Sequence, residues 1–326
     1  MALNIIIDSA IPYIKGVLEP YADVRYIKGA EISREDVSTA DALIVRTRTK
    51  CDRTLLEDSP VSMIATATIG TDHIDFDYCA SRNIEVASAP GCNSSGVCQW
   101  VYAALKALSL KRNISMKGQT IGVVGVGNVG RKVAGMASRF GLEVLQNDPP
   151  RALREGPEAF VTLDELLSDA DIVTLHIPLS EQTHNFASDD FFRKMKPGAI
   201  FINASRGEVV EEDELIANIG NLGGVALDVW KNEPLINRDL MNRVDIATPH
   251  IAGYSAQGKI NGTNMALRAV CTHFGLPELL STMGRGFQGD SVEEIDVDSY
   301  DIMSDDATLR SNCDNFELLR NNYNYR

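Results

Sequence analysis

Three residues of the sequence have the chemistry needed to oxidise an alcohol next to a carboxylate. Arg206, Glu233 and His250 each lie shortly after a short apolar run. An arginine can bind a carboxylate through paired hydrogen bonds, and a histidine can exchange a proton near neutral pH. A carboxylate beside that histidine would fix its tautomer. Each residue alone also suits an ordinary structural position, but their joint placement after strands favours a catalytic set.

A glycine-rich stretch upstream has the pattern of a dinucleotide-binding loop. Gly125, Gly127 and Gly130 follow an apolar run and precede a helix-like segment. These glycines suit a tight turn, a close approach to pyrophosphate, and helix–strand packing. Asp148 follows at about the distance expected of a ribose-binding carboxylate, about 20 residues on. It predicts NAD as the cofactor, because a carboxylate repels the 2′-phosphate of NADP, although the nearby Arg151 leaves NADP open as an alternative.

Two series of alternating strands and helices position these residues. Apolar runs of strand length recur through residues 1–93 and again through 120–247, with gaps that suit crossover helices. The fold class is therefore α/β, with two doubly wound parallel-sheet domains and a short C-terminal extension. Because two crossings join the domains, a ligand cleft is expected between them.

The expected domains are a substrate domain of flavodoxin type, a Rossmann NAD-binding domain, and a less readable C-terminal region. Residues 1–93 and a return helix within 256–275 form the first, and 94–255 form the second. An apolar stripe from Val97 to Leu108 predicts that a long helix opens the NAD-binding domain. Residues 276–326 contain clustered glycines, then many acidic residues, and end rich in asparagine.

Composition limits the classes of partner. The 326 residues include 31 Lys and Arg against 45 Asp and Glu, a formal net charge of −14. This balance argues against binding nucleic acid or an anionic membrane. The six cysteines have no zinc-site spacing, so no metal is expected, and they predict reduced thiols. Without a signal peptide or an apolar run of about 18 residues, a cytoplasmic location is expected.

Together, residues 125–130, 203–207, 228–234 and 248–254 resemble the D-isomer-specific 2-hydroxyacid dehydrogenases. The resemblance is strong over about residues 3–275 and implies an NAD-dependent enzyme. It implies that Arg206 and Glu233 are active-site residues and that His250 is the proton donor and acceptor. Further positions are implied by matching the family motifs. Cofactor-binding positions are Gly125, Gly127, Gly130, Asp148, Asp228 and Gly253, and substrate-binding positions are Thr47, Thr68 and Tyr254.

Additional segments resemble one branch of this family, which acts on a phosphorylated 2-hydroxy acid. They include residues 45–50, 66–73, 89–93 and 250–263. That branch carries a C-terminal dimerisation region, to which 276–326 is similar but shorter, so a homodimer is expected. Two alternatives stay open, namely another D-2-hydroxy acid such as 3-phosphoglycerate, and an NAD-sensing corepressor that uses the same fold as a binding module.

Overall fold

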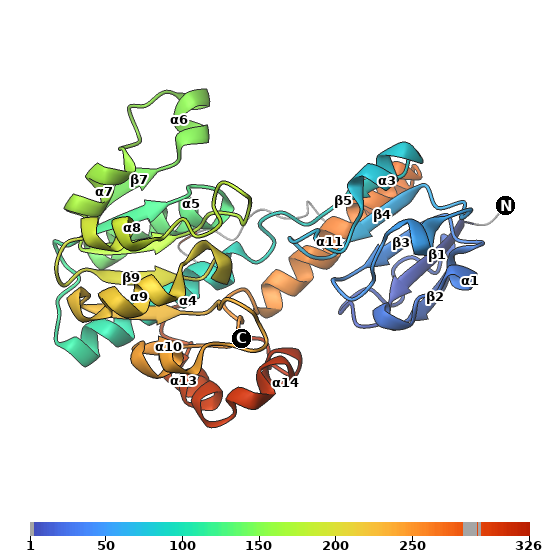
Figure 1. Cartoon of the computed structure of the whole chain (residues 1–326). Coiled ribbons are helices and arrows are strands. Elements are labelled where there is room, and N and C mark those ends of the chain that lie inside the picture. The colour runs from blue at the N-terminus through green and yellow to red at the C-terminus, as the bar shows by residue number, and fades with distance from the viewer. Residues whose placement is uncertain (1–2, 283–291, 293–294) are drawn as a thin grey trace. The chain divides into compact units, whose positions relative to one another are not determined.

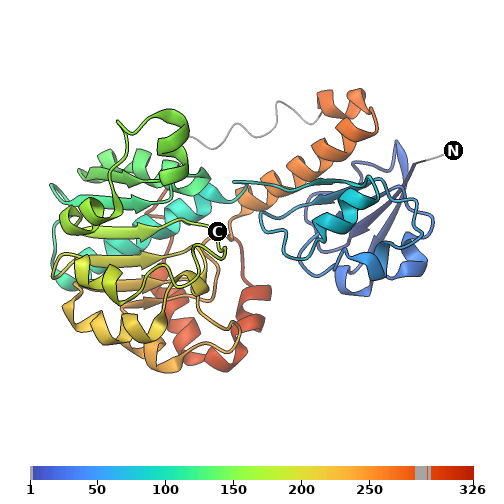
Figure 2. The same cartoon turned by 45° about the horizontal axis from the view of Figure 1, so that its top comes forward.

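The chain folds into two compact α/β units. The computed structural model describes residues 3–282, 292 and 295–326. The first unit comprises the described residues of Met1–Asn93 and Ser255–Asp290, and the second those of Ser94–Tyr254 and Ser291–Arg326. Figures 1 and 2 show helices on both faces of each sheet. Each sheet is parallel, and such sheets are normally covered on both faces.

The first unit has a five-stranded sheet with the flavodoxin-like order β2-β1-β3-β4-β5. Its strands are β1 (Leu3–Asp8), β2 (Ala22–Ile27), β3 (Ala42–Val45), β4 (Met63–Thr66) and β5 (Glu85–Ala87). Its helices are α1 (Arg34–Val37), α2 (Arg53–Leu56), α3 (Phe76–Ser81), α11 (Ala256–His273) and α12 (Pro277–Thr282). Side chains of β1 alternate between two cores, so that Ile5 and Ile7 pack with α11 while Ile6 packs on the other face.

The second unit has a six-stranded sheet in the order β11-β10-β9-β8-β6-β7. Its strands are β6 (Thr120–Val124), β7 (Glu143–Asn147), β8 (Ile172–Leu175), β9 (Ile200–Asn203), β10 (Gly224–Leu227) and β11 (Ile246–Ala247). In the usual Rossmann order, a further strand lies beside the second strand of the unit, which is β7 here. Here Val161 lies in that position and donates its N–H to the Gln146 carbonyl at 2.9 Å, without forming a strand.

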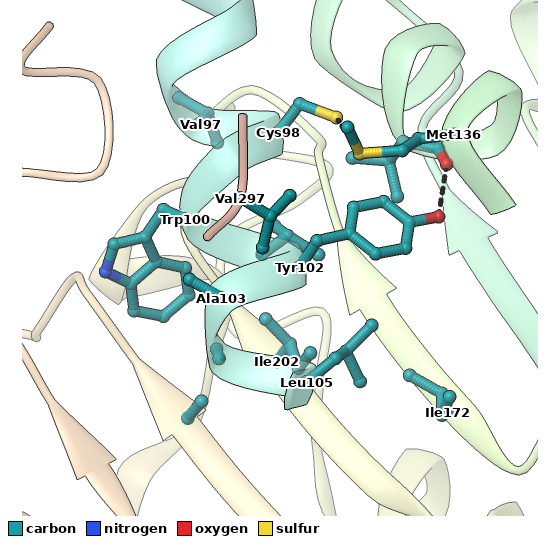
Figure 3. Packing of buried hydrophobic residues seen from close by; sticks show 14 of the residues in the cluster. Val97, Cys98, Trp100, Tyr102, Ala103, Leu105, Met136, Ile172, Ile202 and Val297 are labelled. Carbon is teal, nitrogen blue, oxygen red and sulfur yellow. Dashed lines mark hydrogen bonds between the residues drawn. The ribbon is translucent and has the colours of Figure 1, made fainter. Parts of the chain in front are cut away.

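The helices of the second unit cover both faces of its sheet. They are α4 (Ser94–Arg112), α5 (Asn128–Met136), α6 (Pro149–Glu155), α7 (Leu163–Asp169), α8 (Asp189–Lys194), α9 (Glu212–Asn218), α10 (Arg238–Arg243), α13 (Ile302–Ser311) and α14 (Phe316–Asn321). Figure 3 shows Trp100, Tyr102 and Leu105 of α4 packed in one of its two cores. The buried Tyr102 hydroxyl donates to the Val133 carbonyl at 2.7 Å, which satisfies its polar group.

The predicted fold class is confirmed, and the apolar runs identified every strand within a few residues. The sequence predicted residues 276–326 as a separate C-terminal region, but the structure divides its described residues between the two units. Helix α12 belongs to the first unit, whereas α13 lies beside β11 and α4 in the second. Residues 283–291 and 293–294 of that region lie outside the described residues. Among the helices that the structure describes, none is long and apolar enough to span a membrane.

Candidate active site

The three segments that carry the predicted catalytic residues leave the same edge of the second unit's sheet. Strand β10 ends at Leu227, which is paired with Asn203 of β9 and Ala247 of β11. Arg206, Glu233 and His250 follow these three strand ends. In an open parallel sheet this carboxyl edge is where ligands bind.

Glu233 and His250 form a direct pair. The Nδ1 atom of His250 lies 2.8 Å from Glu233 Oε2. The other carboxylate oxygen, Oε1, accepts the backbone N–H of Trp230 at 3.0 Å. Because a carboxylate accepts at Nδ1, that nitrogen carries the proton, and Nε2 of the neutral ring is an acceptor. The structure thus brings together the histidine and the carboxylate that the sequence predicted.

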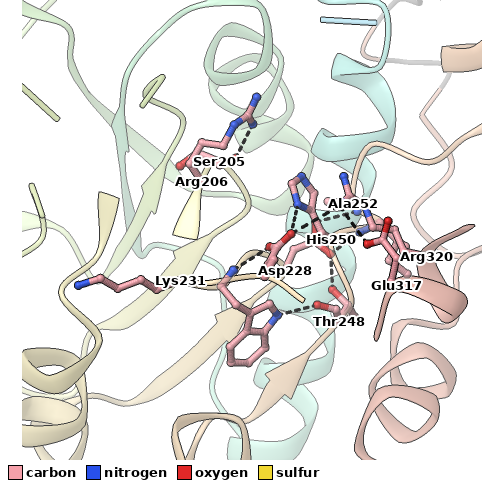
Figure 4. A network of polar contacts seen from close by, with 12 residues as sticks. Ser205, Arg206, Asp228, Lys231, Thr248, His250, Ala252, Glu317 and Arg320 are labelled. Carbon is pink, nitrogen blue, oxygen red and sulfur yellow. Dashed lines mark hydrogen bonds and ion pairs between the residues drawn. The ribbon is translucent and has the colours of Figure 1, made fainter. Parts of the chain in front are cut away.

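Asp228 holds the loop that carries His250. Its side chain is buried, and Oδ1 accepts the Thr248 hydroxyl at 2.5 Å and the Ile251 N–H at 2.8 Å. Its Oδ2 accepts the Ala252 N–H at 2.9 Å. Burial raises the pKa of Asp228, while the His250 charge and these donors act to lower it. Figure 4 shows Asp228 between Thr248, His250 and Ala252.

The backbone of His250 has an unusual conformation, with a φ of 56°. A residue other than glycine rarely adopts this left-handed region, and the surrounding contacts must hold it there. The His250 N–H donates to the Asp228 carbonyl at 2.7 Å, and the next two N–H groups bind the Asp228 carboxylate. One buried aspartate therefore fixes the direction of the histidine side chain.

Arg206 lies on a short turn after β9. The Asn203 side chain accepts the Ser205 N–H at 3.0 Å and donates to the Arg206 carbonyl at 2.9 Å. The Arg206 guanidinium donates to the Ser205 carbonyl at 2.7 Å and, within the described part of the chain, forms no ion pair. Gly207 is required next, because a Cβ there would lie 2.0 Å from the Trp230 carbonyl carbon. The turn presents a half-buried cation at the sheet edge.

The glycine loop brings Gly130 against Gly125 and leaves Gly127 open. A Cβ at Gly130 would lie 2.0 Å from the Gly125 carbonyl oxygen, whereas one at Gly127 would meet nothing within 4 Å. Position 130 must therefore be glycine for the helix to pack closely, whereas the open space at Gly127 leaves the backbone accessible to a ligand. Helix α5 begins directly after Gly127 without a side-chain cap, so the first-turn N–H groups suit a pyrophosphate.

Asp148 lies at the end of β7, next to this loop. Its Oδ2 accepts the Val126 N–H at 2.8 Å, and its Oδ1 accepts the Arg151 N–H at 3.0 Å. Arg151 is paired with Glu155, donating from Nε to Oε1 at 2.9 Å, and also donates to the Val126 carbonyl at 2.7 Å. Because Glu155 neutralises that guanidinium, the local charge suits the ribose of NAD better than a 2′-phosphate.

The remaining predicted positions divide between the units. Thr47 and Thr68 lie in the first unit, just after β3 and β4, and Thr68 Oγ1 lies 2.6 Å from Thr66 Oγ1. Gly253 and Tyr254 follow His250 in the second unit. The Tyr254 ring meets those of Tyr323 and Tyr325 edge to face, each with centroids 6.2 Å apart.

Several residues that support the site were missed from the sequence. The Trp100 indole donates to Thr248 Oγ1 at 3.0 Å, and the Trp230 indole donates to the Thr248 carbonyl at 2.9 Å. Arg320 of α14 lies 3.6 Å from Glu233 Oε2, and Arg326 donates to the Ile251 carbonyl at 3.1 Å. No local pattern reveals these contacts, since they join different segments of the chain, from 18 to 148 residues apart.

Comparison with known proteins agrees with this geometry. Residues 99–252 match the family model described as D-isomer specific 2-hydroxyacid dehydrogenase, NAD binding domain. The chain is 44% identical to erythronate-4-phosphate dehydrogenase of Bacteroides thetaiotaomicron, covering 99% of this chain and 97% of that one. It is 38% identical to the Salinibacter ruber enzyme of the same name, covering 99% and 83%.

Solved structures of related dehydrogenases share the fold. D-lactate dehydrogenase from Aquifex aeolicus, complexed with NAD and lactic acid, has a TM-score of 0.69 and 25% identity, covering 86% of this chain and 98% of that one. NAD-bound 3-phosphoglycerate dehydrogenase from Entamoeba histolytica has a TM-score of 0.71 and 25% identity, covering 84% and 96%. The chain therefore belongs to the erythronate-4-phosphate dehydrogenases, an NAD-dependent family within the D-isomer specific 2-hydroxyacid dehydrogenases.

Proposed function

We propose that the protein oxidises 4-phospho-D-erythronate at C2 to (R)-3-hydroxy-2-oxo-4-phosphooxybutanoate, with NAD as the electron acceptor, in pyridoxal 5′-phosphate biosynthesis. The observation that carries the dehydrogenase chemistry is the Glu233–His250 pair at 2.8 Å, on the same sheet edge as Arg206. The substrate rests on the near full-length similarity to enzymes of that name.

In the proposed mechanism, Arg206 binds the substrate carboxylate and His250 takes the C2 hydroxyl proton through Nε2. Glu233 holds Nδ1–H and stabilises the imidazolium that forms. NAD, when bound, would accept the hydride from C2. Gly127 and the N-terminal turn of α5 would hold its pyrophosphate and Asp148 its ribose. By resemblance to the family, Gly253 and Asp228 would also belong to the cofactor site, with the buried Asp228 carboxylate holding the His250 loop. Thr47, Thr68 and Tyr254 would contact the substrate.

The first test is NADH formation from NAD and 4-phospho-D-erythronate, with 3-phosphoglycerate assayed in parallel. A 2-oxo acid acceptor is included so that tightly held NADH can turn over. Turnover of the erythronate phosphate with little turnover of 3-phosphoglycerate supports the proposal. Turnover of 3-phosphoglycerate alone would keep the reaction and replace the substrate, and turnover of neither by NAD-loaded protein would favour the corepressor-type binding module.

Arg46 supplies a sharper test of the phosphate preference, because it is a half-buried cation just after β3, beside Thr47. Its guanidinium donates to the Ala10 carbonyl at 3.1 Å. An Arg46→Ala variant should raise KM for 4-phospho-D-erythronate and leave KM for unphosphorylated erythronate unchanged. Arg53→Ala, at an exposed arginine of the same unit, is the matched control. An unchanged preference would remove Arg46 from the substrate site.

The quaternary structure and the compartment are separate proposals. By resemblance to its branch, the protein is a homodimer formed through the C-terminal region. The exposed apolar side chains Met303 of α13 and Leu318 of α14, 42% and 56% accessible, suit such an interface. Sedimentation of the native chain and of a Leu318→Glu variant tests this, since the variant should be monomeric. The free cysteines support a reducing compartment such as the cytoplasm, which cell fractionation would test.

A further inference from the structure

The C-terminal helix α14 places a second cation on the proposed catalytic carboxylate. Glu233 Oε2, which accepts from His250 at 2.8 Å, also lies 3.6 Å from Nη1 of Arg320. Its other oxygen is occupied by the Trp230 N–H. One carboxylate oxygen is thus shared between the imidazole and a guanidinium from a helix about 90 residues away in the sequence.

Arg320 is firmly held in this position. Phe316, at the start of α14, is buried in a core of the second unit, which anchors the helix. The Arg320 side chain is hydrogen-bonded to Tyr254 and lies 4.0 Å from Glu317 Oε2. Burial acts to lower the pKa of Arg320, but its interactions with Tyr254 and Glu233 outweigh burial and raise it. The guanidinium is therefore charged at every working pH. Figure 4 shows Arg320 and Glu317 near His250.

The geometry points to Arg320 as a positioning residue that restrains the Glu233 carboxylate and shares its negative charge with His250. This inference rests on the proposed dehydrogenase mechanism. A cation beside the pair opposes protonation of the imidazole, because like charges repel. Among the described residues, the other charged or titratable groups that interact with the pair or with Arg320 are Asp228, Tyr254 and Glu317, from the neighbouring loops and α14.

The charge of Arg320 affects the protonation state of the His250 imidazole. Hydroxy acid oxidation requires a neutral imidazole that can accept a proton. Without Arg320, His250 would have the carboxylate to itself and would keep its proton up to a higher pH. The acidic limb of the kcat/KM profile should therefore move upward, while the plateau at higher pH stays in place.

The test compares NAD-saturated wild type with Arg320→Gln and Arg320→Lys. In Arg320→Gln the acidic limb should rise by roughly half a pH unit, which lowers kcat/KM about threefold on that limb. The lysine variant should restore most of the wild-type profile, because it keeps the charge. Arg238→Gln is the matched control, since Arg238 pairs with Asp314 at an exposed site and its loss should leave the profile unchanged.

A second readout does not depend on substrate. The NMR titration of the His250 imidazole, assigned by its loss in His250→Asn, should shift upward in Arg320→Gln by a similar amount. If wild type turns over no tested acid, the proposed function fails while this titration still decides the role of Arg320. An unmoved or lowered titration and acidic limb in folded Arg320→Gln would overturn the inference. A rise in KM alone would also overturn it, by making Arg320 a substrate ligand.

Discussion

At the scale of single residues, His250 can act as the proton acceptor because Glu233 fixes its tautomer. His250→Asn keeps a side chain of similar size but cannot accept the proton. We expect kcat to fall by about 10²–10⁴-fold, the usual contribution of a general acid–base. NAD affinity, measured by calorimetry, should change little, because Asp148 and the glycine loop are untouched.

The matched control for that variant is His184→Asn. His184 is an exposed histidine of the same unit, and its replacement should leave kcat unchanged. If His250→Asn retained wild-type kcat under conditions where His184→Asn also did, another group would have to accept the proton. The assignment of His250 would then be wrong.

A second residue-scale prediction concerns His176, which lies half-buried just after β8 with Nε2 3.0 Å from Thr174 Oγ1. Burial lowers the pKa of His176 to about 3, well under the ordinary value near 6.5. Between these values the unfolded chain binds one more proton than the folded chain. The stability that His176 contributes is therefore complete above pH 6.5 and is lost progressively as the pH falls towards 3.

Urea unfolding at pH 7 and pH 5 checks this sign. Wild type should lose about 2 kcal/mol more than His176→Gln over this interval, since each pH unit of differential protonation is worth about 1.4 kcal/mol. The comparison removes the contributions of other titrating groups, which both proteins share. If both proteins lost the same free energy of unfolding, folding would not lower the pKa of His176.

At the scale of elements, the sequence predicted strands well because a parallel sheet is buried on both faces. Strands such as β3 and β8 are wholly buried, so their apolar runs stand out from the polar helices around them. The sequence also predicted that Arg206, Glu233 and His250 lie at one edge of the sheet, because the carboxyl ends of parallel strands share one side of it. The contacts of Asp228 with Thr248, Ile251 and Ala252 were not predicted, since they depend on how the loop folds back.

The C-terminal segment was poorly predicted for a related physical reason. Residues of α13 and α14 take part in long-range contacts, and such contacts leave no periodic signal in their own segment. Asp306, for example, accepts the Ala247 N–H of β11 at 2.7 Å. Arg310 donates to the Val244 carbonyl at 3.0 Å. Their partners lie about 60 residues away, so composition alone suggested only an acidic tail.

This segment leads to a prediction about the catalytic loop. Arg326 donates to the carbonyls of Gly96, Ile251 and Ala252. Its guanidinium also lies 4.1 Å from the Tyr300 ring centroid. Replacing it with alanine removes these bonds, and we expect a loss of about 1–3 kcal/mol in the free energy of unfolding.

Hydrogen exchange gives the local readout for Arg326→Ala. The N–H groups of Ile251 and Ala252, which bind Asp228, should exchange faster than in wild type. Arg193→Ala is the control, because Arg193 is largely exposed on α8 and, in the part of the chain that the structure describes, forms its ion pair with Asp189 of the same helix. Its stability should stay within about 0.5 kcal/mol of wild type. Unchanged exchange at both amides would mean that Asp228 alone holds the loop.

At the scale of the whole molecule, the two units have separate hydrophobic cores. The two cores of the first unit contain residues of 5–84 and 266–279, whereas those of the second draw on 97–252 and 295–316. No buried residue of these described cores is shared between the units. The residues proposed to hold NAD all belong to the second unit. NAD should therefore stabilise the second unit directly and leave the intrinsic stability of the first unchanged.

Both tryptophans, Trp100 and Trp230, lie in the second unit, so fluorescence-monitored melting reports that unit alone. NAD at about 100 times its Kd adds about 2.7 kcal/mol, which should raise the fluorescence midpoint by roughly 5–10 °C. Far-UV circular dichroism reports both units and should keep a component that does not move. If the two probes instead gave one coincident transition that shifted as a whole, the units would unfold cooperatively. The cofactor would then stabilise both units, although its proposed ligands come from only one.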